Sequence, residues 1–241
     1  MINRNPFMAE PGALSDDGMR ATAHVPVSAR VYDEIRSRII SLDLPPETTL
    51  QRAELAERFG ISQSPLREAL MRLEQDGLVI SYPQSRTVVT RLDATRIREE
   101  HFLRTAVECE VVRQLAERRD MEALRKAKGF LKMQEALVDD VEQAVLFKQL
   151  DEAFHGALFA AVNQTALHRQ ITARCGHLAR LRTLDLPRTP KMKSVLEGHQ
   201  AVVDAIDTGD GDLAARTMRK HLSGTMERLP QIMRENEDLF V

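Results

Sequence analysis

A carboxylate and an imidazole stand on the apolar face of one predicted helix. In the segment predicted as a helix over residues 141–162, Asp151 and His155 are four positions apart and share a face with Phe147, Phe154 and Leu158. An unpaired carboxylate on a buried face is costly, so Asp151 is expected to have a partner there. Aspartate and histidine at this spacing can offer one oxygen and one nitrogen to a single ion.

Two more histidines stand on the apolar faces of later predicted helices. His199 shares a face with Val195 and Val202, and His221 shares one with Leu222. We therefore predict a His₃Asp metal site built from Asp151, His155, His199 and His221. Such donors suit a divalent metal ion, with Zn or Ni as the leading choices, although they do not determine its identity. A histidine on an apolar face is more often a satisfied core residue, so a structural cluster stays open.

The remaining histidines fit no such stripe and are predicted to be surface or structural residues: His24, His101, His168 and His177.

An arginine and a glutamate form a possible pair on the first predicted helix of the bundle, where Arg104 and Glu108 are four positions apart. They can form an ion pair on the helix surface, worth a few tenths of a kcal/mol. Alternatively, Arg104 lies at a cavity wall and binds a ligand carboxylate through both arms of its guanidinium.

The composition of the chain is that of an ordinary globular protein. The 241 residues are 43% hydrophobic and 29% charged, as in ordinary globular proteins, and aromatic residues make up only 4%. The net charge of −2 provides no global basic field for nucleic acid, so any DNA-binding surface must be local. No apolar run approaches the ~18 residues of a membrane span, and the N-terminus lacks a signal-like apolar block, which predicts a cytoplasmic location. Cys109 and Cys175 are predicted to be buried thiols without a disulfide.

The pattern predicts a mainly α fold with two domains after a flexible N-terminal arm, residues 1–27. Residues 28–92 show a helix, a short helix at 52–59, a turn at Gly60 and a third helix after Ser62. Two β-branched runs at 78–80 and 87–90 then predict a hairpin, which completes a winged helix-turn-helix. Residues 93–241 are predicted to form an all-α bundle of six helices, at about 93–118, 121–138, 141–162, 164–184, 191–207 and 210–235.

The third helix of the N-terminal domain has an exposed face suited to the major groove. Its apolar residues face inward, which leaves Gln63, Ser64 and Arg67 outside, and Arg67 can bind guanine or phosphate. The N–H groups at the start of this helix can meet a phosphate. Arginines outnumber acidic residues by five to three over residues 58–91. We predict a surface for double-stranded operator DNA formed by Arg52, Ser62, Gln63, Ser64, Arg67 and Arg86. The alternative is a protein-interaction module in which Arg67 only pairs with Glu68 or Glu74.

The stretch LAERFGISQSPLREALMRLEQDGLV, from Leu55 to Val79, resembles the winged-helix signature of the GntR family of bacterial transcription regulators. The resemblance implies DNA contacts from Ser62, Gln63, Ser64, Arg67 and the wing. The chain differs from the family's usual pattern at Gln63, where arginine is common. It also has Ser85-Arg86 where an Arg-Gly pair is common, and Arg52 where an acidic residue is frequent. We expect these differences to affect which operator sequence is recognised and to leave the fold unchanged.

The C-terminal region resembles the ligand-sensing FCD domain of the FadR branch of that family. The matching features are Arg104 and Glu108, Asp151 and His155, Asn163, and His199 with His221. The resemblance implies a helical bundle around a divalent metal, with a small organic acid effector bound near it, and a homodimer. Arg104 and Asn163 are the implied effector-binding residues.

The leading hypothesis is a metabolite-responsive transcription regulator whose operator affinity changes when the bundle binds a carboxylate. One alternative is a metal-dependent enzyme that uses the His₃Asp site to activate water. A di-iron bundle would need two Glu-x-x-His motifs, and the chain has one, at Glu152 and His155. A third reading is a DNA-binding regulator with a purely structural metal. Operator binding that responds to a metabolite without consuming it distinguishes the first from the second.

Overall fold

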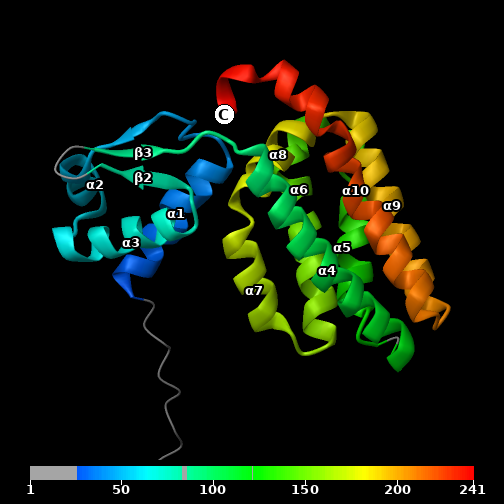
Figure 1. Cartoon of the computed structure of the whole chain (residues 1–241). Helices are drawn as coiled ribbons and strands as arrows, with labels where there is room; N and C mark the ends of the chain where they lie inside the picture. The colour runs from blue at the N-terminus through cyan, green and yellow to red at the C-terminus, as the bar shows by residue number, and fades with distance from the viewer. Residues whose placement is uncertain (1–25, 83–85, 121) are drawn as a thin grey trace, which may run out of the picture.

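The computed structural model describes residues 26–82, 86–120 and 122–241. Most of the expected arm, His24 and the hairpin turn at residues 83–85 lie outside these ranges. Figure 1 shows two units joined by a short linker. The first contains α1 (Val27–Ile40), β1 (Thr49–Leu50), α2 (Arg52–Phe59), α3 (Gln63–Gln75), β2 (Val79–Ser81) and β3 (Thr87–Val89). The second contains α4 (Ala94–Arg118), α5 (Arg125–Glu135), η1 (Val141–Gln143), α6 (Ala144–Ala161), α7 (Thr165–Arg174), α8 (Gly176–Asp185), α9 (Thr189–Asp207), α10 (Gly211–Glu235) and η2 (Glu237–Leu239).

The first unit is a winged helix-turn-helix, as predicted. Gly60 ends α2 with a φ of +60°, a left-handed conformation that glycine adopts without strain and that lets α3 cross α2. The predicted hairpin forms, and a strand that the sequence analysis missed, β1, completes an antiparallel sheet of order β1-β3-β2. With only two residues, β1 has no alternation to detect. α1 and α3 pack on each other through a core that includes Ile35, Ile39 and Leu66.

The second unit is an all-α bundle in which the long helices α4 and α10 lie side by side (Figure 1). Asp93 caps α4 by accepting hydrogen bonds from the backbone N–H groups of Thr95 and Arg96. The largest apolar core joins α4, α6, α9 and α10, with Val112, Phe154 and Val202 at its centre.

One predicted bundle helix is two helices in the structure. The segment expected as a single helix over 164–184 breaks at Cys175, so seven α-helices, not six, follow the linker in the described ranges. Cys175 has a non-helical backbone, with φ −92° and ψ 46°. A Cβ on the next residue, Gly176, would collide with the side chain of Leu78. The break therefore lets α8 approach the winged helix closely, a tertiary contact that helical spacing does not report.

The C-terminal residues return to the linker between the units. Leu92 and Phe240 form a parallel β-bridge, and Phe240 is buried in a small core with Leu92, Ile97 and Leu181. Both cysteines are free and buried. In the part of the chain that the structure describes, no helix combines the length and apolarity needed to cross a membrane.

Candidate metal and effector site

The four predicted metal ligands converge in the bundle. Asp151 and His155 lie on α6, His199 on α9 and His221 on α10, and one potential ligand atom from each lies within 4.8 Å of all the others. Asp151 Oδ1 is 3.5 Å from His199 Nε2, and the Nε2 atoms of His155 and His221 are 3.4 Å apart. Because three helices bring oxygen and nitrogen donors to one point, the cluster has the composition and compactness of a metal site.

Neighbouring side chains fix the orientation of two of these imidazoles. His155 Nδ1 lies 2.5 Å from Glu108 Oε2, and His199 Nδ1 lies 2.7 Å from Gln134 Oε1. A proton on each Nδ1 satisfies these contacts and leaves both Nε2 lone pairs directed at the centre of the cluster. His199 Nε2 is buried without a hydrogen bond, and the nearest carboxylate, that of Asp151, is also an acceptor. A cation between these two acceptors would satisfy both, so the residues fit a metal.

The protonation states of the cluster suit metal ligation, which needs neutral imidazole and ionised carboxylate. Burial lowers the pKa of His221 to about 3. Burial and the nearby His221 hold the pKa of His199 well below its usual value. Burial alone would raise the pKa of Asp151, but Arg182 and the cluster histidines outweigh it and keep the carboxyl ionised.

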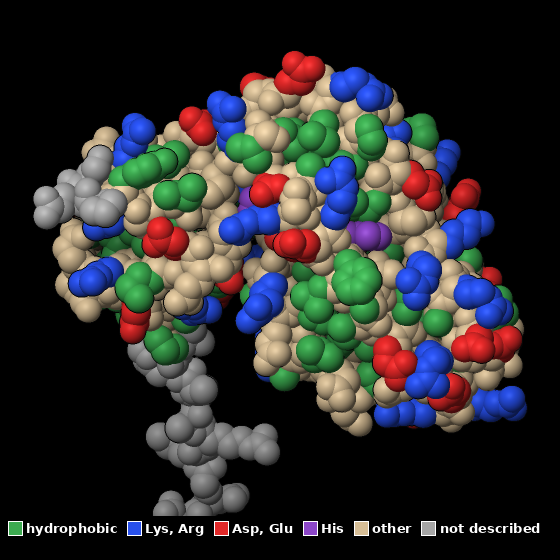
Figure 2. All heavy atoms as spheres, viewed as in Figure 1, with side chains coloured by type: hydrophobic (Ala, Val, Ile, Leu, Met, Phe, Trp, Pro, Cys, Tyr) green, Lys and Arg blue, Asp and Glu red, His purple; other side chains and the backbone are tan. Residues whose placement is uncertain are grey.

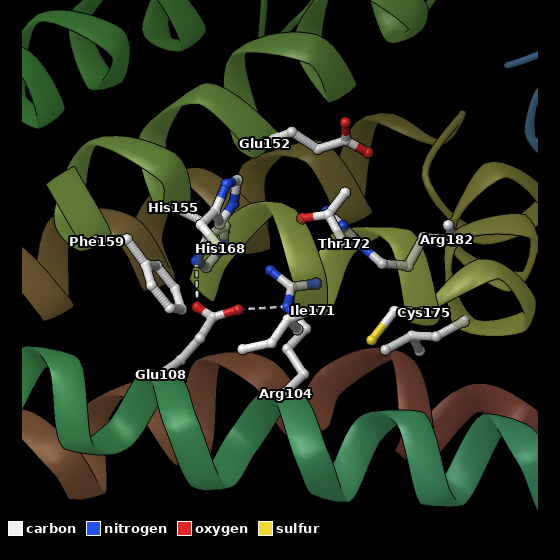
Figure 3. A pocket seen from close by; sticks show the side chains of 12 residues that line it. Arg104, Glu108, Glu152, His155, Phe159, His168, Ile171, Thr172, Cys175 and Arg182 are labelled. Carbon is white, nitrogen blue, oxygen red and sulfur yellow. Dashed lines mark hydrogen bonds and ion pairs between the residues drawn. The ribbon is translucent and has the colours of Figure 1, made fainter. Parts of the chain in front are cut away.

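Cationic side chains surround the cluster. Arg104 Nε donates to Glu108 Oε1 at 2.5 Å, and their side chains are only 11% and 4% exposed, so they do not form the helix-surface ion pair considered from the sequence. Arg182 of α8 pairs with Asp151 Oδ2. Figure 3 shows Glu108 of α4 between Arg104 and the imidazole of His155, while Arg182 points toward them from α8.

Two cavities adjoin the cluster and share a wall. Their volumes are about 40 and 30 Å³, each is partly open to solvent, and both are lined by Arg104, His155, Leu178 and Arg182. A cavity of this size holds a few water molecules, so a ligand would displace water and move lining side chains. The arrangement can therefore offer a ligand carboxylate two guanidinium groups beside a metal position.

Sequence reasoning missed two residues of this site. Gln134 is fully buried and orients His199, and it follows Ala127 and Leu131 at helical spacing on α5, the same signal that singled out Asp151. Arg182 belongs to the segment in which the helix break was not foreseen, and its partner Asp151 is 31 residues away. No spacing rule links two residues on different helices.

The other residues considered from the sequence lie at different places. Asn163 is exposed, with a φ of 63°, just after α6 ends, and it lines neither cavity. His101 and His168 each line one of the cavities. His177 is buried between the two units, where burial lowers its pKa to about 4 and its Nε2 lies 3.1 Å from the carbonyl oxygen of Gly77.

The predicted DNA-binding residues lie at the surface of the winged helix. Ser62, Gln63, Ser64 and Arg67 are all exposed around the first turns of α3. Ser62 is the N-cap of α3, and its hydroxyl makes no capping hydrogen bond. In the described ranges Arg67 has no carboxylate within 4.0 Å, so an ion pair with Glu68 or Glu74 does not occupy its guanidinium.

The remaining two lie at the wing. Arg52 begins α2 and is exposed, with Nη2 3.4 Å from Thr87 Oγ1 in the wing. Arg86 precedes β3, with its guanidinium 5.5 Å from the centre of the Tyr82 ring. Both leave side-chain donors available to a phosphate.

Comparison with known proteins decides the family. A model of the bacterial regulatory proteins of the gntR family matches residues 27–89, and a model of the FCD domain matches residues 100–224. The chain belongs to the GntR family. It is a DNA-binding transcription regulator with an FCD domain, and the enzyme alternative is set aside because its relatives are regulators.

Two relatives and one solved structure show how similar the chain is to known regulators. An uncharacterized HTH-type transcriptional regulator in an unstable DNA locus of Streptomyces ambofaciens is 32% identical over 210 residues, which cover 87% of this chain and 88% of the relative. The HTH-type transcriptional repressor RspR of Escherichia coli is 28% identical over 215 residues, covering 89% and 94%. The E. coli McbR/YncC structure has a TM-score of 0.67 at 19% identity, covering 88% and 99%, which shows a shared fold.

We expect Gln134→Leu to weaken metal binding by about 10–100-fold, since it removes the acceptor that holds His199 Nδ1. Leucine fills a similar volume in this fully buried position but offers no hydrogen-bond acceptor. Titration of metal-free protein with Zn²⁺ or Ni²⁺ measures the change, and thermal unfolding of both metal-free proteins is the control. Equal affinities would show that Gln134 does not support the site.

Proposed function

We propose that this GntR regulator represses transcription by binding operator DNA as a homodimer, and that a small organic acid bound beside a divalent metal in its FCD domain changes operator affinity. The observation that carries the proposal is the cluster in which His199 Nε2 and Asp151 Oδ1 face each other without a proton donor. The repressor RspR supports repression as the mode of action. Zn or Ni remains our proposed metal, since both accept histidine nitrogen and carboxylate oxygen.

The charges beside the cluster favour an anionic effector. When bound, the metal supplies a Lewis-acidic position for a carboxylate oxygen. Arg104 and Arg182 line both adjoining cavities and can bind and orient the same carboxylate. Their present partners, Glu108 and Asp151, hold them at the cavity wall. A carboxylate would form ion pairs with both guanidinium groups, whereas a neutral ligand would form only hydrogen bonds, so we propose an organic acid.

Helix α8 offers a route from this cavity to the DNA-binding unit. At the cavity, Arg182 pairs with Asp151. Two residues earlier, Arg180 is fully buried and donates from Nη1 to the backbone oxygen of Thr90 at 2.6 Å, at the end of β3. Thr183 donates to the backbone oxygen of Ile40 at 2.8 Å, at the end of α1. Because one short helix contacts the cluster and two parts of the winged helix, a shift caused by the effector can move the recognition helix.

A second copy of the chain is the proposed partner in DNA binding. Two recognition helices about 34 Å apart can read successive major grooves of a palindromic operator. Figure 2 shows apolar side chains gathered on the face of the bundle along which α4 runs, and Phe102 of α4 is 76% exposed. An exposed aromatic side chain in such a patch is typical of an interface. Sedimentation equilibrium of the full chain tests dimerisation, and a monomer at micromolar concentration would contradict it.

We expect Arg67→Ala to lower specific operator affinity by about 5–150-fold while the fold stays intact, because a bidentate base contact is worth ~1–3 kcal/mol. Fluorescence anisotropy with operator selected from a random DNA pool measures the loss at several salt concentrations. If Arg67 contacts only phosphate, the loss is uniform across sequences and the salt slope falls by about one. Arg169→Ala, which alters an exposed arginine of α7 in the bundle, is the matched control. Unchanged affinity at every salt concentration would remove Arg67 from the interface.

The function as a whole is tested by the response to effector. Metal-loaded protein is screened against small mono- and dicarboxylates by thermal shift, since a ligand that binds the folded state raises its apparent stability. Each binder is then titrated into labelled operator complex. A compound that stabilises the protein, changes operator affinity and is recovered chemically unchanged supports the proposal. Operator binding that no carboxylate alters would leave only a regulator with a structural metal.

A further inference from the structure

A third, larger cavity lies between the two units. Its volume is about 370 Å³, it is partly open to solvent, and α1 of the winged helix forms one wall with Arg36 and Ile40. The opposite wall belongs to the bundle, with Val145 and Lys148 of α6 and Thr172 of α7. We call this space the interdomain groove. It adjoins the cavity in Figure 3, because Glu152, Thr172 and Ala179 line both.

Two cationic side chains in the groove have no acidic partner. Lys148 Nζ donates to Thr183 Oγ1 at 2.6 Å and to the backbone oxygen of Ala179 at 3.5 Å. Arg36 Nη2 donates to the backbone oxygen of Thr172 at 2.5 Å, and its Nε is buried without an acceptor. Over the described ranges, no carboxylate oxygen lies within 4.0 Å of either cation.

This arrangement is unfavourable without a counterion. Burial lowers the pKa of Lys148 to about 8, because the ammonium loses solvation and the attraction of Glu152, one turn along α6, offsets only part of that loss. Two acids also line the groove, Asp33 on α1 and Glu152 on α6, but neither is paired with Lys148 or Arg36. An anion between the two cations would offset the part of this cost that Glu152 leaves uncompensated.

We propose that the interdomain groove binds a small carboxylate or phosphate anion, held by Arg36 from the winged helix and Lys148 from the bundle. Arginine offers a planar pair of donors and lysine a compact charge, the combination that binds carboxylate and phosphate oxygens. The apolar side chains of Ile40 and Val145 give the rest of the ligand a surface to contact. This site is separate from the metal cluster and does not depend on the function proposed for that cluster.

The anion would join the two units. One of its contacts comes from the first helix of the winged helix and the other from α6, the helix that carries Asp151 and His155. Its binding therefore stabilises the relative position of the units seen here. The groove has both of its walls only while the winged helix and the bundle are in contact, because each unit supplies one wall.

The test uses the full chain loaded with metal, and inorganic phosphate and succinate as probes. Isothermal titration calorimetry measures the affinity of each probe for the wild type, Lys148→Met and Arg36→Gln. Methionine keeps the apolar stem of lysine without its charge. We expect each variant to lose about 10–100-fold in affinity for the probe that binds, since a hydrogen bond to a charged group is of that size. Whether phosphate or succinate binds identifies the source of the anion.

Two controls separate this site from the metal site and from surface charge. Lys126→Met removes an exposed lysine of α5 and should leave the affinity unchanged. Arg104→Ala disables the proposed effector site and should leave binding in the groove unchanged. The proposal is overturned if neither probe binds the wild type at millimolar concentration, or if binding is lost in Arg104→Ala but kept in both groove variants. Thermal unfolding of Lys148→Met and Arg36→Gln, which alter different units, shows that each folds.

Discussion

Purified His199→Ala protein is expected to contain almost no divalent metal, whereas the wild type carries about one ion per chain. His199 is fully buried, its Nε2 has no hydrogen bond, and Gln134 directs that nitrogen at the cluster. Removing a ligand should cost more than the 10–100-fold loss that follows the removal of an outer partner. Elemental analysis after dialysis measures the metal content, and titration of metal-free protein measures the affinity.

The matched control is His168→Ala, which removes a half-buried histidine that lines an adjoining cavity but does not belong to the cluster. That variant should keep the wild-type metal content. His155→Ala should behave as His199→Ala does, because His155 belongs to the same cluster. Equal metal content in the wild type, His155→Ala and His199→Ala would show that the three histidines and Asp151 form a structural cluster only.

Arg104→Ala is expected to abolish the response of operator binding to the effector and to leave ligand-free operator binding nearly unchanged. Arg104 lines both cavities beside the cluster and lies on α4, which follows the wing directly through Leu92 and Asp93. A carboxylate shared by Arg104 and the metal would join α4 to α6, α9 and α10. Coupling of ~1–3 kcal/mol corresponds to a change of roughly 5–150-fold in operator affinity, and this change should disappear.

The measurement is a titration of effector into labelled operator complex with both proteins. Because Arg104→Ala leaves the buried Glu108 without its arginine, thermal unfolding accompanies the titration and Arg104→Gln serves as a milder variant. Arg113→Ala is the matched control: it removes an arginine from the same helix that pairs with the exposed Glu110 and Glu117. A variant at Arg104 that responds to the same effector concentration and to the same extent as wild type would show that Arg104 only pairs with Glu108.

The sequence by itself determined most of the elements and the four residues of the cluster. The change from helical to alternating spacing after Asp76-Gly77 predicts the wing, and Gly60 marks the turn before the recognition helix. Periodicity also placed Asp151, His155, His199 and His221 on buried faces, because the side that a helix buries depends on spacing that is visible along the chain. Turns and buried helix faces depend on residues that are close together in the chain, so their pattern can be read from the sequence.

The tertiary structure decided which buried groups meet. The break at Cys175 lies where Gly176 approaches Leu78, which is 98 positions earlier in the chain by their numbering, so helical spacing could not predict it. Arg182 pairs with Asp151 and Gln134 with His199 across separations of 31 and 65 residues. A contact between side chains on different helices depends on how those helices pack, and packing depends on the whole core rather than on the spacing within one element.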